Sequence, residues 1–122
     1  MTEAEMIQEL DAIRDESDRI LNLFENGRVP HAKVPEAQEL FRTLKEKLQT
    51  EYRRMATIRG EAALSDVEAH FYQPAIRDAW TNTLISSVRW NSRPDHRWHD
   101  ALWSVSDYMG HWSGHLRSAG KS

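Results

Sequence analysis

Apolar side chains recur at alternating intervals of four and three residues in this 122-residue chain, and this spacing constrains the fold more than any other feature. The first run spans residues 2–26 and contains Met6, Leu10, Ile13, Ile20 and Phe24, with Ser17 in the remaining position. On a helix with about 100° per residue, these positions form a stripe about 80° wide, which is typical of a coiled-coil seam. The spacing therefore predicts a long amphipathic helix over residues 2–26.

The same spacing resumes after a short polar loop. The second run spans residues 35–64 and contains Ala37, Leu40, Phe41, Leu44, Leu48, Tyr52, Met55, Ile58 and Ala62. Charge supports pairing of the two segments, because residues 1–26 carry eight acidic side chains and residues 42–59 carry six basic ones. We expect residues 1–64 to form an antiparallel helical hairpin.

A third helix is predicted to begin at Ser65, because Ser65 and Glu68 have the spacing of a capping box. Its apolar side chains change face at Pro74: those before it are Val67 and Phe71, and those after it are Ile76, Trp80, Leu84 and Val88. Proline removes a helical hydrogen bond and clashes with the preceding turn. We therefore expect this helix to be broken near Pro74.

The regular spacing returns in residues 94–117, where the apolar positions are Trp98, Leu102, Val105, Met109, Trp112 and Leu116. No run of alternating β-branched residues predicts a strand. The predicted fold is all-α: an elongated four-helix bundle in which the hairpin is followed by a Trp- and His-rich helical pair over residues 65–118. The length suits one domain spanning residues 1–122.

Composition excludes several classes of function. The chain has no cysteine, which excludes disulfides, thiolate nucleophiles, Cys-ligated zinc and iron–sulfur clusters. Its net charge of −3 provides no overall basic field that would hold nucleic acid or an anionic membrane. The acidic start is unlike a secretory signal, and no stretch approaches the roughly 20 apolar residues of a membrane helix. We expect a soluble, cytoplasmic protein with no membrane partner.

Four of the six histidines lie between residues 96 and 115, which suggests a metal site. Only Asp107, His111 and His115 lie close enough together on one helix face to share an ion. They point away from the apolar seam, so a solvated face with Asp–His pairs is the favoured interpretation, and no metal or other cofactor is expected. The chain has no Glu-x-x-His motif and no Gly-x-Ser-x-Gly elbow. An enzyme is therefore disfavoured, and a metal-dependent helical-bundle enzyme remains an alternative.

The connection between the last two predicted helices, residues 89–99, combines three Arg with two Trp and two His. Basic side chains among aromatic ones suit phosphate contact and base stacking. An alternative function is therefore a small subunit that binds a nucleic-acid backbone through Arg53, Arg54, Arg89, Trp90, Arg93 and Arg97. The favoured interpretation is structural, with Trp90 and Trp98 closing the end of the bundle.

One side of the last predicted helix carries Trp103, Ser106, Gly110 and Gly114, outside the apolar seam. An interior glycine costs a helix about 1 kcal/mol relative to alanine, so two of them need a reason. Small residues permit another backbone to approach closely, and an exposed Trp is a common anchor for a partner. Two interpretations stay open: the stripe binds a partner, or another helix of the same chain covers it.

The sequence as a whole favours a non-enzymatic protein–protein interaction module, meaning an adaptor, an inhibitor or a small subunit of a larger assembly. The long amphipathic helices, the acidic first helix and the stripe that begins at Trp103 all support this prediction. The expected partner is another protein or a second copy of the chain, with nucleic acid as a secondary candidate.

Overall fold

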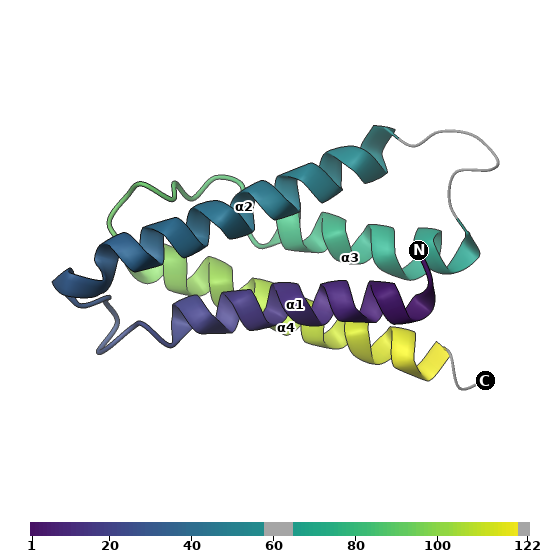
Figure 1. The fold of residues 1–122 in the computed structure, drawn as a ribbon, viewed down its shortest axis with the longest axis horizontal. Helices are drawn as coiled ribbons and strands as arrows, with labels where there is room; N and C mark the ends of the chain where they lie inside the picture. The colour runs from purple at the N-terminus through teal and green to yellow at the C-terminus, as the bar shows by residue number, and fades with distance from the viewer. Residues whose placement is uncertain (58–64, 120–122) are drawn as a thin grey trace.

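The computed structural model describes residues 1–57 and 65–119, and this part of the chain folds into four rods, each antiparallel to the next (Figure 1). The rods are α1 (Glu3–Leu21), α2 (Val34–Thr57), a third rod of three pieces, and α4 (His96–Ala119). In the described residues, extended pairing is limited to an isolated bridge between Glu25 and Arg28. The all-α prediction is confirmed. Across the same residues, no helix combines the length and apolar character needed to cross a bilayer.

α1 begins with a capping box and ends earlier than its periodicity predicted. Thr2 Oγ1 accepts a hydrogen bond from the Glu5 N–H at 3.1 Å, and the Glu5 side chain accepts one from the Thr2 N–H at 2.9 Å. The helix ends at Leu21, and beyond it Asn26 and Gly27, with φ of 54° and 83°, form a tight turn. The buried positions of α1 are the predicted ones: Met6, Leu10, Ile13, Ser17 and Ile20.

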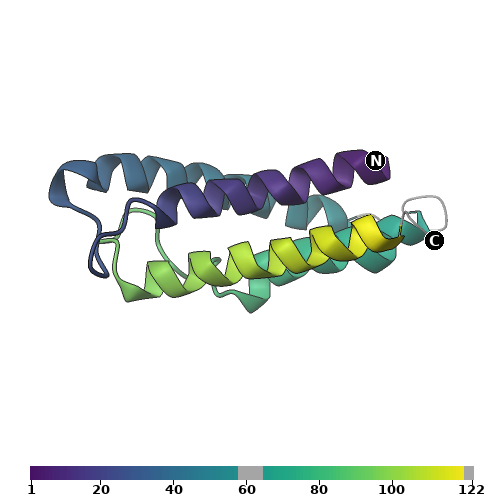
Figure 2. The ribbon, with the colours of Figure 1, turned by 90° about the horizontal axis from the view of Figure 1, so that it is seen from below.

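α1 and α2 form the predicted antiparallel hairpin, but α1 packs most extensively against α4 (Figure 2). The charge attraction expected within the hairpin is carried by Lys47, whose Nζ lies 3.2 Å from Glu9 and 3.1 Å from Glu16 of α1. Arg42 instead pairs with acidic side chains of its own helix. The predicted last turns of the second helix, residues 58–64, lie outside the described residues.

The third rod is broken around Pro74 as predicted, and the break takes the form of π-helical turns. Its pieces are η2 (Glu68–Tyr72), α3 (Gln73–Arg77) and η3 (Asp78–Asn82), of which the first and last are π-helical. A π turn holds about one residue more than an α turn. Tyr72, which was not among the predicted apolar positions, is fully buried, and it lies four residues before the buried Ile76. Leu84, predicted on the apolar face, lies past the end of the rod.

α4 begins directly after Asp95, whose carboxylate accepts a hydrogen bond from the Arg97 N–H at 3.0 Å. At this end of the bundle Trp98 is fully buried, and its ring centroid lies 4.2 Å from that of Phe41 on α2. Trp98 therefore closes the end of the core, whereas Trp90 remains partly exposed.

Candidate interaction surfaces

The stripe predicted on α4 is divided between the bundle interior and the solvent. Ser106 Oγ donates a hydrogen bond to Asp18 of α1 at 2.6 Å. A Cβ placed on Gly110 would lie 3.8 Å from the Arg14 side chain, also on α1. Ser106 and Gly110 therefore face α1, so this half of the stripe is covered by a helix of the same chain.

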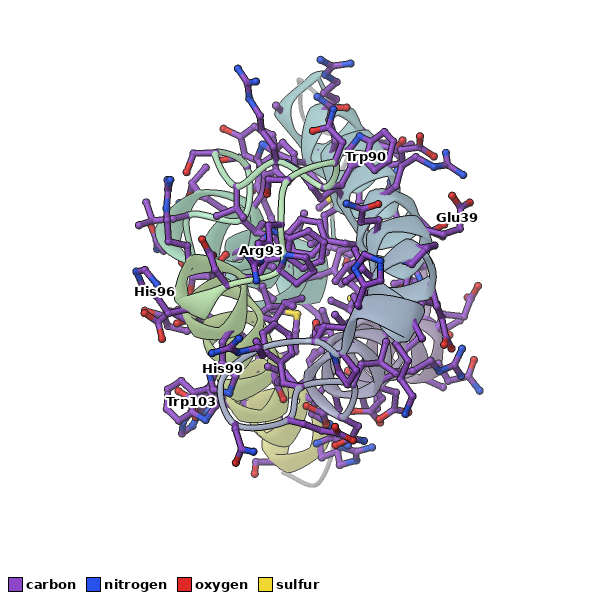
Figure 3. The ribbon with its side chains drawn as sticks, turned by 90° about the vertical axis from the view of Figure 1, so that its left-hand side faces the viewer. Glu39, Trp90, Arg93, His96, His99 and Trp103 are labelled. Atoms are coloured by element: carbon purple, nitrogen blue, oxygen red, sulfur yellow. The ribbon has the colours of Figure 1, made fainter. Side chains whose placement is uncertain are left out.

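The other two members of the stripe, Trp103 and Gly114, lie on the outer face of α4. Trp103 is 57% exposed and points away from the bundle, on the side that also carries His96 (Figure 3). Among the described residues outside its own helix, no heavy atom lies within 4 Å of a Cβ placed on Gly114. The two positions are eleven residues apart, which puts them on the same helix face at an axial distance of about 16 Å.

Leu84, predicted on the apolar face of the third helix, is instead a second exposed apolar side chain near Trp103. It is 65% exposed, and its φ of 64° lies in the left-handed region, where leucine is rare. Leu84, Asp100 and Ser104 line a hollow of about 290 Å³, and the latter two also border Trp103. We call the surface formed by these four residues the Trp103 surface. The polar run 81–83 just before Leu84 is the signal of a helix end that periodicity alone overlooked.

The candidate metal ligands of α4 do not converge. Asp107 Oδ1 lies 3.5 Å from His111 Nε2, and both side chains are exposed. His115 instead contacts the ring of Trp112, with the centroids 5.7 Å apart. In residues 1–57 and 65–119, no three His, Asp or Glu side chains gather as a metal site would require. The structure therefore does not bring the three candidate ligands Asp107, His111 and His115 together.

The arginines of the nucleic-acid alternative lie at opposite ends of the bundle. Arg89, Arg93 and Arg97 lie where the chain passes from the third rod to α4, and Figure 3 looks directly at this end. Arg53 and Arg54 lie in the last turns of α2, at the far end. The structure therefore does not bring the six predicted residues into one site.

The loop end of the bundle, where the connections α1–α2 and third rod–α4 meet, brings together basic side chains from both loops. Arg28 and His31 of the first loop line the same cavity as Arg93 of the second. Gln38 Nε2 donates a hydrogen bond to the Ser92 carbonyl oxygen at 3.0 Å and ties the second loop to α2. The sequence alone does not reveal that Arg28 and His31 lie beside Arg93, because more than sixty residues separate them from it and no local pattern relates the two loops.

A polar groove between α1 and α2 holds charged groups that satisfy one another. Tyr72 Oη donates a hydrogen bond to Glu51 at 2.7 Å, and Arg54 donates one to the same carboxylate at 2.9 Å. The hydrogen bonds from Arg54 and Tyr72 hold the pKa of Glu51 below its usual value despite burial. Burial, together with the contact to Glu51, raises the pKa of Tyr72. We assign this network a structural role.

No protein-family model, curated protein or solved structure matches this chain.

Proposed function

We propose that this chain is a non-enzymatic protein–protein interaction module that docks through the outer face of α4. The observation that carries the proposal is Trp103, which is 57% exposed. The other tryptophans of α4 have partners within the bundle: Trp98 is fully buried, and Trp112 donates a hydrogen bond to Asp78 at 2.8 Å. Exposing a large aromatic ring to water is unfavourable, and Trp is among the residue types most enriched at the energetic centres of interfaces.

The surroundings of Trp103 also support docking. Leu84 extends the apolar surface across the hollow that Asp100 and Ser104 line. Its left-handed backbone costs about 1–2 kcal/mol, and strain of this kind clusters at functional sites. Polar side chains separate and surround the two apolar ones, as in interfaces that have an apolar centre and a polar rim.

The occupant that best fits this face is a second copy of the chain. An antiparallel pair of α4 helices places Trp103 of each copy against Gly114 of the other, where the space beside the backbone is open. The same register, centred close to Met109, brings Asp107 of one copy near His111 of the other. Each copy would therefore offer the same contacts to the other, as the interface of a two-fold dimer requires.

Sedimentation equilibrium over protein concentrations of about 1–200 µM tests the proposal. We expect the chain to dimerise and Trp103→Ala to raise the dissociation constant at least about tenfold, because truncating a central Trp commonly costs 2 kcal/mol or more. Trp90→Ala is the matched control, since it removes another partly exposed Trp at the loop end and should leave the dimer unchanged. The proposal is contradicted if the parent chain stays monomeric at every concentration. It is also contradicted if the dissociation constant of the Trp103→Ala dimer equals that of the parent.

A further inference from the structure

The loop end of the bundle contains a cavity of about 590 Å³, a volume within the range of roughly 300–1,000 Å³ that small-molecule sites occupy. Its apolar lining comes from Val29 and Val34 together with Pro30. Its basic lining comes from Arg28 and His31 on one loop and from Arg93 on the other, near the centre of the view in Figure 3. No carboxylate lines the cavity in the described part of the chain.

The second loop is held in place by hydrogen bonds that leave the Arg93 guanidinium unused. Ser92 is the anchor: its Oγ donates to the Arg89 carbonyl oxygen at 2.6 Å and accepts from Trp98 Nε1 at 2.9 Å. Its carbonyl oxygen accepts from Gln38 Nε2 at 3.0 Å. A backbone fixed in this way presents its side chains to a ligand without a large ordering cost.

The first loop is fixed by the turn at Asn26 and Gly27. The Glu25 N–H donates to the Arg28 carbonyl oxygen at 2.6 Å, and the Arg28 N–H donates back to Glu25 at 3.2 Å. Lys33 then donates its N–H to the Pro30 carbonyl oxygen at 2.8 Å, which starts the short helical turn leading into α2. Arg28 and His31 thus project from a backbone that is already ordered.

The positive charge at this cavity has no counter-charge within the described residues. Arg28 and Arg93 form no ion pair there, the acidic residues Glu25 and Glu36 do not line the cavity, and two other acids at this end are engaged elsewhere. Asp95 caps α4, and Glu39 binds Arg42 on the outer side of α2, where Figure 3 shows it directed away from Arg93. Two guanidinium groups beside one cavity repel each other, and a bound anion relieves that repulsion. Although the net charge of the chain is −3, Arg28 and Arg93 therefore lie at the loop end of the bundle without an ion pair among the described residues.

From this arrangement we propose that the cavity binds a small organic phosphate. Arg28 and Arg93 donate to the phosphoryl oxygens, since the planar guanidinium fork matches phosphate geometry. His31 contributes a further ring N–H, and the apolar lining holds the organic part of the ligand. This site is independent of the Trp103 surface and does not require the chain to dimerise.

A single-stranded nucleic acid fits the loop end less well. Such a ligand needs a basic track with several stacking platforms, and the basic side chains of Arg53 and Arg54 lie at the far end of the bundle. Trp90, 38% exposed, does not line the cavity. The neighbouring hollow that contains Arg89 and Arg97 is also lined by Asp95, whereas the cavity of Arg28, His31 and Arg93 has a basic rim and an apolar lining, which favours a small ligand that carries one phosphoryl group.

Titration with phenyl phosphate, followed by calorimetry and by amide NMR shifts, tests the site. We expect binding that is tighter than that of inorganic phosphate, because the ring reaches the apolar lining. The shifts should concentrate in residues 28–34 and 91–93. Arg28→Gln and Arg93→Gln should each weaken phenyl phosphate binding at least about tenfold, the range expected for a lost charge-assisted hydrogen bond. Arg53→Gln, an exposed arginine at the opposite end, is the control and should change nothing.

Unchanged thermal unfolding shows that each variant is folded. If Arg93→Gln unfolds, Arg93→Lys replaces it: the charge remains but the fork is lost, so binding should weaken by a smaller factor. The proposal is overturned if phenyl phosphate binds Arg93→Gln as tightly as the parent, or if the shifts map outside the two loops. It is also overturned if a ten-residue oligothymidine binds more than tenfold tighter than phenyl phosphate and depends on Arg89 and Trp90, because the site would then be a nucleic-acid site.

Discussion

Ser106 of α4 donates a hydrogen bond of 2.6 Å to Asp18 of α1, and this contact marks the boundary between the packed and the open sides of α4. One turn further along, Gly110 also faces α1. Trp103 and Gly114 lie on the side that α1 leaves open. Substitutions on the two sides should therefore act on different properties: on stability where α1 covers α4, and on docking where it does not.

Gly114→Ala is expected to stabilise the isolated chain by up to about 1 kcal/mol, because alanine favours the helix and the space for its Cβ is open. Gly110→Ala should give a similar gain, since its Cβ would make an ordinary contact with Arg14 at 3.8 Å. Gly114→Leu, by contrast, should weaken the dimer because it fills the space proposed for Trp103. Urea unfolding and sedimentation measure the two effects, and a Gly114→Leu chain that dimerises normally contradicts the antiparallel register.

Leu84→Gly is expected to leave stability unchanged or to raise it by up to about 1 kcal/mol. Glycine adopts a φ of 64° without the steric cost that leucine pays there, and the exposed side chain contributes little to the core. Ile85→Ala is the contrast: Ile85 is fully buried, so its truncation should cost about 2–5 kcal/mol. Urea unfolding of both variants checks this pair. A Leu84→Gly loss above about 1 kcal/mol would show that Leu84 packs within the chain.

The free energy of unfolding is expected to fall on acidification, because folding lowers the pKa of Glu51 and of Asp11. For Glu51 the main cause is the hydrogen bond from Arg54. For Asp11 burial acts in the opposite direction, but hydrogen bonds from Ser113 and Arg117 outweigh it. Such groups bind protons more readily in the unfolded chain. Their stabilisation is therefore present above the ordinary carboxyl pKa of about 4 and is lost as pH falls through the folded-state values. Urea unfolding at about pH 3 to 7 measures it, and a flat profile contradicts it.

Tyr72→Phe removes the hydroxyl that donates to Glu51 and keeps the buried ring. We expect a loss of about 1–2 kcal/mol at neutral pH, and a smaller loss once acidification protonates Glu51, because the hydroxyl then donates to a neutral carboxyl group. Tyr108→Phe, which changes a half-buried tyrosine on α4, is the matched control and should lose much less. Equal losses in the two variants, or no pH dependence of the Tyr72→Phe loss, would contradict the role assigned to the Tyr72–Glu51 contact.

The same tyrosine predicts a loss of stability in alkali. Burial raises the pKa of Tyr72 in the folded chain, so deprotonation favours the unfolded state once the pH exceeds the ordinary tyrosine pKa of about 10. Denaturant unfolding between about pH 8 and 11 should show this decline in the parent chain and a shallower decline in Tyr72→Phe. Identical slopes would mean that Tyr72 ionises as freely in the folded chain as in the unfolded one.

Ser92→Ala leaves the indole N–H of buried Trp98 without its partner. We expect a loss of about 1–3 kcal/mol, because an unsatisfied buried donor loses its hydration without replacement. Ser86→Ala, at an exposed position in the same loop, should be nearly neutral. Chemical unfolding compares the two variants, and equal stabilities would show that Ser92 does not anchor the loop.

The buried faces of α1 and α4 were predictable because helical periodicity is a local property. Spacings of four and three placed Met6, Leu10 and Ile13 in the core, and likewise Trp98 and Leu102. The prediction was less accurate in the third rod, where the apolar pair Val67 and Phe71 indicated one face but Tyr72 is the fully buried side chain. Tyr72 lies four residues before the buried Ile76, and adjacent aromatic residues at 71 and 72 left the choice of face ambiguous in the sequence.

The candidate sites depended on contacts between distant segments. Arg28 and Arg93 line one cavity although sixty-five positions separate them, and their meeting depends on the lengths and directions of the rods between them. Arg53 and Arg93, which composition placed in one candidate set, lie at opposite ends of the same bundle.

By itself the amino-acid sequence determined that the fold is all-α, most of the side chains that α1 and α4 bury, and that the third rod breaks near Pro74. It determined these because apolar periodicity, capping residues and proline act on neighbouring residues. Only the tertiary structure decided that α1 lies against α4, so that Ser106 and Gly110 are covered while Trp103 remains exposed. The pattern of apolar residues on a helix predicts which face is buried. Because apolar contacts are non-directional, the pattern does not predict which neighbouring helix covers that face.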